Sequence, residues 1–233
     1  MAESAIAGGA STISKYPGVL PANFPRLDPR RASGGRIYGT DGREYVDWIS
    51  GLGPNLLGYG HSVVEEAVAR IKAPSLSLVS DLEERVADRV RRLAGFPDGK
   101  VRFYATGSEA CSAAVRIARA VTGRPLILSC GYHGWGSDAM TTPPAWGVPP
   151  ALRALTRTFP FNRADLAENA CFGLDCDGTG PVGRIGADDP NIHGDVIAAM
   201  IVEPATLDDP ESGFLEKLRA LCDRFGILLI FDE

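Results

Sequence analysis

Short apolar runs alternate with amphipathic segments through the second half of the chain. Four of these runs have the length of strands and lie at 101–105, 126–130, 197–202 and 227–231. Residues 108–121 and 211–225 instead repeat apolar positions every three to four residues, and these segments end at Gly123 and Gly226. Such alternation predicts an α/β fold with three layers, in which helices flank a mostly parallel sheet.

The first part of the chain has a different pattern, with strong turn signals. Residues 35–48 alternate around Thr40-Asp41-Gly42, and an Asp-Gly step between two strand-like runs predicts a β-hairpin. The stretch 51–58 is too rich in glycine and proline for a regular element, so it predicts a loop. We therefore predict an N-terminal segment with a hairpin at 1–60 and a larger domain at 61–233.

Two pairs of polar residues have the spacing of capping boxes. Ser62 with Glu65, and Ser80 with Glu83, each precede apolar positions at helical spacing, which predicts two helix starts. The stretch from Ala170 to Gly194 is dense in Gly, Asp and Pro and has no periodicity, so we predict an irregular surface insertion there.

Composition and charge narrow the range of functions. The chain has 233 residues and a net charge of -5 with both signs interspersed, and it has no basic stripe for nucleic acid. No apolar run approaches the roughly 20 residues that span a bilayer, and the first residues lack the basic start of a secretory signal. We expect a soluble, cytoplasmic protein.

The cysteines predict neither a disulfide framework nor a zinc ribbon, because none of them forms a CxxC pair. Cys171 and Cys176 with His193 do not have a standard metal spacing, and Asp175 with Asp177 does not match a calcium loop. We therefore predict no metal site and expect most cysteines to be small core residues.

The turn at 106–110 lies between a predicted strand and a predicted helix, where free backbone N–H groups face an anion. Gly107 allows close approach of the backbone, and Ser108 is able to cap the helix and to donate its hydroxyl. The turn therefore suits a phosphate group. A helix cap without a ligand is the alternative, because serine is a common cap and the spacing fits neither a Walker loop nor a dinucleotide fingerprint.

Aromatic, imidazole and carboxylate side chains follow the other predicted strands, at the edge where parallel sheets bind ligands. Tyr132 is able to stack on a flat ring, and His133 to hydrogen-bond nearby. Glu203 and Asp232 end the last two strands. A carboxylate such as Asp232, placed opposite a pyridine nitrogen, keeps that nitrogen protonated and makes the ring an electron sink. The alternative is that these side chains only cover the sheet end or lie in solvent.

Four motifs, in this order, resemble the class III aminotransferases, most closely their glutamate-1-semialdehyde aminomutase-like branch. They are Thr106-Gly107-Ser108-Glu109-Ala110, Tyr132-His133-Gly134, Val202-Glu203-Pro204 and Ile230-Phe231-Asp232-Glu233. Stretches 41–47, 53–58 and 213–215 are also similar, so the resemblance covers most of the chain from about Gly35 onward. It implies the cofactor pyridoxal 5'-phosphate (PLP) and a fold type I transferase. Residues 61–233 would form the first part of its PLP-binding large domain, and residues 1–60 would contribute to its small domain.

The resemblance also implies the residues that bind the cofactor, which are Gly107, Ser108, Tyr132, His133, Glu203 and Asp232. The first two would bind the phosphate, the tyrosine would stack on the ring with the histidine nearby, and the aspartate would hold the pyridine nitrogen. The glutamate would lie close to cofactor and substrate. The implied activity is transfer of an amino group between an amino compound and a carbonyl compound, by a protein that forms homodimers.

Two departures from the family pattern limit what the resemblance implies. The Schiff-base lysine of the family follows the Phe-Asp-Glu motif by a few tens of residues, and the printed chain ends at Glu233. No lysine of the chain has the matching position, since the candidates are Lys15, Lys72, Lys100 and Lys217. We expect the chain alone to be inactive and to bind PLP weakly and non-covalently. Ala205-Thr206 replaces the Gly-Asn step of many relatives, and relatives that aminate sugars look similar here, so the substrate stays open.

Two other functions also stay open. A non-catalytic, truncated relative would use the same platform to bind a phosphate ligand or a partner protein. A nucleotide-binding Rossmann oxidoreductase has the same alternation of strands and helices, but here no G-x-G-x-x-G opens the first helix.

Overall fold

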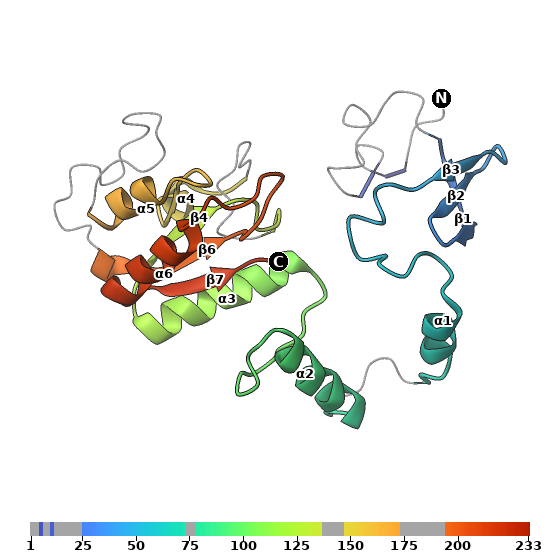
Figure 1. Ribbon diagram of the computed structural model, residues 1–233, viewed down its shortest axis with the longest axis horizontal. Coiled ribbons are helices and arrows are strands. Elements are labelled where there is room, and N and C mark those ends of the chain that lie inside the picture. Colours follow the sequence, from blue (N-terminus) through green and yellow to red (C-terminus); the bar gives the residue numbers. More distant parts are fainter. Residues whose placement is uncertain (1–4, 7–9, 12–24, 73–77, 137–146, 173–193) are drawn as a thin grey trace. The chain divides into compact units, whose positions relative to one another are not determined.

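The structure is a computed structural model that describes residues 5–6, 10–11, 25–72, 78–136, 147–172 and 194–233 (Figure 1). The chain divides into two compact units, Met1–Arg85 and Val86–Glu233. No helix within the described ranges is long and apolar enough to cross a membrane.

The first unit contains a small antiparallel sheet. β1 (Leu27–Ser33), β2 (Arg36–Gly39) and β3 (Glu44–Val46) lie side by side in that order. β2 and β3 form the predicted hairpin, in which Gly42 has a φ of 85°, a left-handed conformation that costs glycine little. The hairpin prediction is confirmed, whereas β1 is a strand that the sequence did not predict.

Two helices follow this sheet in the sequence, α1 (Ser62–Ala69) and α2 (Asp81–Leu93). The predicted capping role of Ser62 is wrong, because Ser62 is already the first helical residue; the N-cap is His61, and its side chain makes no capping hydrogen bond. Ser80 does cap α2, since its Oγ accepts a hydrogen bond from the backbone N–H of Glu83 at 3.2 Å.

The second unit is built on a parallel sheet with the strand order β5-β4-β6-β7. The strands are β4 (Leu126–Cys130), β5 (Thr156–Thr158), β6 (Ile197–Val202) and β7 (Leu228–Phe231). Every residue of β4 and β6 is buried, as expected for parallel strands that are covered on both faces. Three predicted strands are confirmed.

The predicted strand at 101–105 is wrong. These residues form no strand in the structure, and Phe103 and Tyr104 are exposed. An extended run needs a neighbour to take its backbone hydrogen bonds, and none of the described strands pairs with it. β5, by contrast, was not predicted, because its Thr-Arg-Thr sequence is short and polar.

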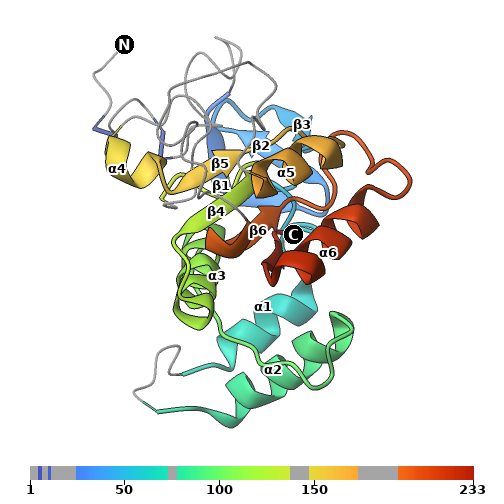
Figure 2. The same ribbon diagram turned by 90° about the vertical axis from the view of Figure 1, so that its left-hand side faces the viewer.

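Helices cover both faces of this sheet (Figure 1 and Figure 2). On one face, α3 (Gly107–Thr122) packs against Ile127 and Ile201. On the other face, α5 (Ala164–Cys171) and α6 (Phe214–Phe225) pack against the alternate strand residues, which include Leu128, Met200 and Val202. Successive residues of a strand point to opposite faces, so the predicted three-layer α/β fold is confirmed.

Glycines set the ends of α3 and α6. α3 and α6 end at the predicted glycines, Gly123 and Gly226, with φ values of 69° and 63°. α6 begins at Phe214 and not at residue 211 as predicted, because Gly213 is a left-handed N-cap with a φ of 82°. A residue in that conformation cannot continue a right-handed helix.

The predicted irregular stretch from Ala170 to Gly194 is wrong at its described ends. Ala170 and Cys171 belong to α5, and both are buried, while Gly194 opens a short 3-10 turn before β6. Residues 173–193 lie outside the described residues, as do Cys176, His193, Asp175 and Asp177. A further short helix, α4 (Pro150–Arg153), precedes β5.

Candidate active site

The turn at the start of α3 leaves backbone N–H groups available. Thr106 is the N-cap: its Oγ1 accepts a hydrogen bond from the N–H of Glu109 at 3.2 Å, and the Glu109 carboxylate accepts one from the N–H of Thr106 at 3.0 Å. The predicted capping role of Ser108 is therefore wrong, because Ser108 lies inside the first turn. Among the described residues, the N–H groups of Gly107 and Ser108 have no hydrogen-bond partner, so an anion is able to accept from them.

Ser108 contacts the loop that follows β4. Its Oγ accepts a hydrogen bond from the backbone N–H of Gly136 at 3.2 Å. Gly134, with a φ of 87°, comes so close that a Cβ there would lie 2.7 Å from the Cα of Ser108, well inside van der Waals contact. The first turn of α3 and this loop are therefore packed together without room for another side chain.

Glu203 is bound by the same loop. Its backbone N–H donates to the carbonyl of Cys130 at 3.1 Å, which continues the pairing of β6 with β4. Its Oε2 accepts a hydrogen bond from the backbone N–H of Tyr132 at 2.9 Å. The side chain of Tyr132 is half exposed, so the backbone of this residue holds the carboxylate while its ring stays accessible.

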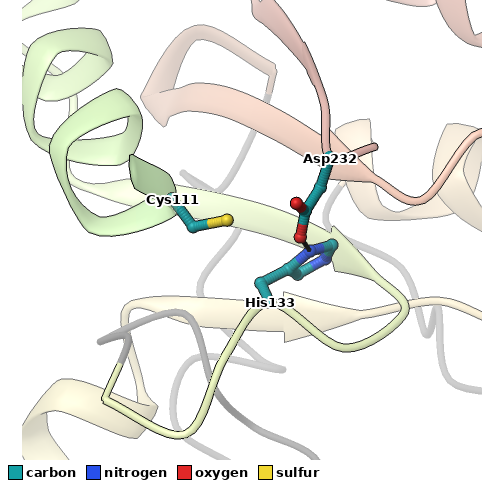
Figure 3. A group of neighbouring side chains, drawn as sticks. All are labelled: Cys111, His133 and Asp232. Atoms are coloured by element: carbon teal, nitrogen blue, oxygen red, sulfur yellow. Dashed lines mark hydrogen bonds and ion pairs between the residues drawn. The ribbon is translucent and has the colours of Figure 1, made fainter. Parts of the chain in front are cut away.

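His133 and Asp232 form a pair at the end of β7 (Figure 3). Their Nδ1 and Oδ2 atoms are 2.8 Å apart, and the side chains are 1% and 24% exposed. With an ionised carboxylate, this hydrogen bond requires the proton on Nδ1, while Nε2 has no partner in the described part of the chain. The N–H of Asp232 donates to the carbonyl of Val202 at 3.0 Å, which keeps the aspartate in register with the strand edge.

Cys111, in the second turn of α3, is a third member of this cluster and was not predicted as a site residue. Its Sγ and the polar atoms of His133 and Asp232 lie within 4.8 Å of one another (Figure 3). Burial and the neighbouring Asp232 carboxylate raise the pKa of Cys111 to about 12. The sequence did contain a signal for Cys111 as a site residue. Cys111 shares a helix face with Val115 and Ala118, and of these three residues it lies nearest the turn at the start of α3.

The loop at 131–136 connects the predicted site residues. It donates backbone hydrogen bonds to Ser108 and Glu203 and contributes the imidazole that contacts Asp232. Within the described ranges, no hydrogen bond joins Ser108 directly to either carboxylate. The predicted residues thus meet at the carboxyl ends of β4, β6 and β7, through this loop.

A helix start with N–H groups that no described residue accepts from, an accessible aromatic ring and a partly exposed acid thus lie at the carboxyl ends of the strands, the edge where α/β proteins bind ligands. The chain belongs to the class-III aminotransferase family, which matches residues 20–233. The family resemblance expected from the sequence motifs is confirmed.

Individual relatives agree with this assignment. The glutamate-1-semialdehyde 2,1-aminomutase of Syntrophus aciditrophicus is 35% identical over 221 residues, which are 87% of this chain and 46% of that protein. The solved FumI protein of Sphingopyxis sp. has a TM-score of 0.76 at 30% identity, over 97% of this chain and 51% of that one. An omega-transaminase from Sphaerobacter thermophilus has a TM-score of 0.74 at 25% identity, over 97% and 52%. The chain spans about half the length of the curated relatives it matches.

Proposed function

We propose that the complete protein is a PLP-dependent aminotransferase or aminomutase, which transfers an amino group between an amino compound and a carbonyl compound. The pair of His133 and Asp232 carries this proposal, because a carboxylate held at the sheet edge is the partner that a protonated pyridine nitrogen requires. The aminomutases and the omega-transaminase among the similar proteins support transfer of an amino group.

The residues present fit this cofactor. The N–H groups of Gly107 and Ser108, for which no described residue is an acceptor, would hold the phosphate at the start of α3. The accessible ring of Tyr132 would stack on the pyridine ring, and Asp232 keeps part of its carboxylate exposed for the ring nitrogen. The similar FumI protein was solved in a PLP form. When bound, PLP supplies an electron sink for the reacting carbon of the substrate.

In this proposal, residues of this chain would orient the cofactor ring and polarise it. Asp232 favours the protonated ring nitrogen through a charge-assisted hydrogen bond, and His133 holds the carboxylate in place. Glu203 fixes the backbone of Tyr132, and so it sets the position of the stacking ring near cofactor and substrate. Residues 1–60 would contribute to a small domain and residues 61–233 to the PLP-binding domain. The complete protein would act as a cytoplasmic homodimer on small molecules, without nucleic acid.

The test uses the complete gene product, loaded with PLP and assayed for amino transfer from primary amines to 2-oxo acids. Asp232→Asn removes the charge at constant size, so we expect kcat to fall by roughly 100-fold or more, the effect of one preorganised electrostatic partner. Asp223→Asn is the matched control, because Asp223 forms an exposed ion pair with Arg219 on α6. Equal rates for the two variants, or no transfer by the loaded protein, would refute the proposal.

A further inference from the structure

The segment between β6 and α6 starts at the candidate site and returns to the core. It follows Glu203, whose carboxylate is bound by the loop at 131–136, and it leads to Phe214, the first residue of α6. We call residues 204–213 the β6–α6 connection. Its residues 205–209 are all exposed, so burial in the core does not fix their position.

Asn162, in the turn after β5, contacts this connection with both ends of its side-chain amide. Its Oδ1 accepts a hydrogen bond from the backbone N–H of Glu211 at 2.8 Å, and its Nδ2 donates one to the backbone carbonyl of Asp209 at 3.2 Å. These partners lie 49 and 47 residues further along the chain. The amide therefore makes a tertiary contact with the backbone of the connection.

The residues around Asn162 support the same contact. The φ of Asn162 is 62°, a left-handed conformation that asparagine adopts more readily than most residues with a Cβ. The ring of Phe161 packs edge-to-face on that of Phe214, with the ring centroids 5.1 Å apart, and Phe214 is buried. The turn after β5 thus holds the end of the connection by two hydrogen bonds and one ring contact.

The exposed part of the connection is closed on itself. The N–H of Thr206 donates to the carbonyl of Asp208 at 3.2 Å, and the N–H of Asp208 donates to the Oγ1 of Thr206 at 3.2 Å. This compact turn has Leu207 at its tip. On one side the turn is joined to Glu203 in the site, and on the other side to the two backbone groups that Asn162 binds.

We propose that Asn162 is a positioning residue, which holds the β6–α6 connection in place beside Glu203 for binding of the substrate. This role rests on the proposed function, in which Glu203 lies near cofactor and substrate. A connection that is already fixed loses little freedom when a substrate binds next to it, whereas a loose one has to be ordered at a cost in affinity. The proposed phosphate, ring and nitrogen contacts of PLP come from other elements, so Asn162 acts on substrate binding and not on cofactor binding.

The contact is tested first in the complete protein without cofactor, by hydrogen–deuterium exchange and mass spectrometry. Asn162→Gly removes both hydrogen bonds and still adopts the left-handed backbone. We expect exchange in peptides over 204–211 to be about 5- to 10-fold faster, the effect of two hydrogen bonds near the lower end of their usual range. Exchange in α6 is expected to stay the same.

Asp165→Asn is the control for this exchange experiment. Asp165 lies in the first turn of α5 and forms an exposed ion pair with Arg163, so this variant is expected to exchange like the unmodified protein. Unchanged exchange over 204–211 in Asn162→Gly overturns the proposal. An equal increase in α6 overturns it as well, because the change would then loosen the domain and not the connection.

The positioning role is then tested by steady-state kinetics of the PLP-loaded protein with a primary amine. We expect the KM for the amine to rise about 5- to 10-fold in Asn162→Gly, while kcat and PLP affinity stay within about twofold. Asn162→Asp keeps the acceptor for the Glu211 N–H and loses the donor to the Asp209 carbonyl, so its KM is expected to be intermediate. A residue with only a structural role would lower the unfolding temperature and leave KM unchanged.

The outcomes separate this inference from the function on which it rests. If exchange becomes faster and KM does not change, the positioning role is refuted and the proposed function stands. If kcat and PLP affinity fall together with the rise in KM, the variant disturbs the cofactor site, and a specific role in substrate binding is refuted. If the unmodified protein transfers no amino group, the proposed function fails and the positioning role with it, while the exchange result still decides whether Asn162 holds the connection.

Discussion

Gly134 is the position where one methyl group tests the packing of the site. A Cβ there would lie 2.7 Å from the Cα and 2.8 Å from the Cβ of Ser108, so the loop and the start of α3 would have to move apart. Such overpacking costs about 1–3 kcal/mol. The left-handed backbone at Gly134, with a φ of 87°, costs a residue with a Cβ roughly 1–2 kcal/mol more. We therefore expect Gly134→Ala to lower the free energy of unfolding by about 2–5 kcal/mol.

Gly213→Ala separates these two contributions. Gly213 has nearly the same φ, 82°, but apart from its chain neighbours no atom of the described residues lies within 4 Å of a Cβ built there. This variant loses only the backbone contribution, roughly 1–2 kcal/mol. The difference between the two variants then measures the clash with Ser108. Urea unfolding of the complete protein gives both free energies, provided that the m-values stay equal.

Gly134→Ala is also expected to weaken PLP binding. Ser108 and the N–H groups beside it are the proposed phosphate site, and losing one hydrogen bond to a charged group costs about 1.5–3 kcal/mol, or roughly 10- to 100-fold in affinity. Gly213→Ala keeps the affinity, as measured by the same PLP titration. If the two variants unfold at the same urea concentration and bind PLP equally well, the packing between Gly134 and Ser108 does not constrain the site.

Core packing, helix capping, thiol ionisation and cofactor attachment provide four further tests. Leu218→Ala, at a fully buried residue, lowers the free energy of unfolding by about 2–5 kcal/mol, whereas Leu207→Ala, at an exposed residue, changes it by less than about 0.5 kcal/mol in the same urea experiment. Thr106→Ala removes the cap of α3 and costs about 0.5–2 kcal/mol, measured by thermal unfolding. Burial raises the pKa from 9.0 to about 12 in the thiols of Cys111, Cys130 and Cys222. The unfolded chain releases these protons first, so stability is full below about pH 9 and falls as the pH rises toward 12; equal urea midpoints at about pH 8 and pH 11 would contradict this. Residues 1–233 alone, mixed with PLP and borohydride, yield no single modified lysine by mass spectrometry.

Three strands of the parallel sheet could be predicted because each is an apolar run of strand length. β4 and β6 are covered on both faces and buried at every position, whereas the ends of β7 are exposed. The same signal was misleading at 101–105, where no described strand pairs with the apolar run. β5 was missed for the opposite reason, since its pairing with β4 and not its composition makes it a strand. An apolar run shows which segments gain from burial, whereas both burial and strand pairing depend on tertiary contacts that one segment does not encode.

For the candidate site too, the sequence predicts one part, the location of the residues, while tertiary contacts determine the rest. Because the carboxyl ends of parallel strands meet at one edge, the shared location of His133, Glu203 and Asp232 could be predicted. The groups that contact these carboxylates could not be predicted. Glu203 is bound by the backbone N–H of Tyr132, a group that nearly every residue has, and the thiol of Cys111 lies within 4.8 Å of the Asp232 carboxylate on an apolar helix face, where cysteine looks like any core residue. Since one loop, 131–136, contacts both carboxylates and the start of α3, the backbone conformation of this loop sets the positions of all three motifs relative to one another.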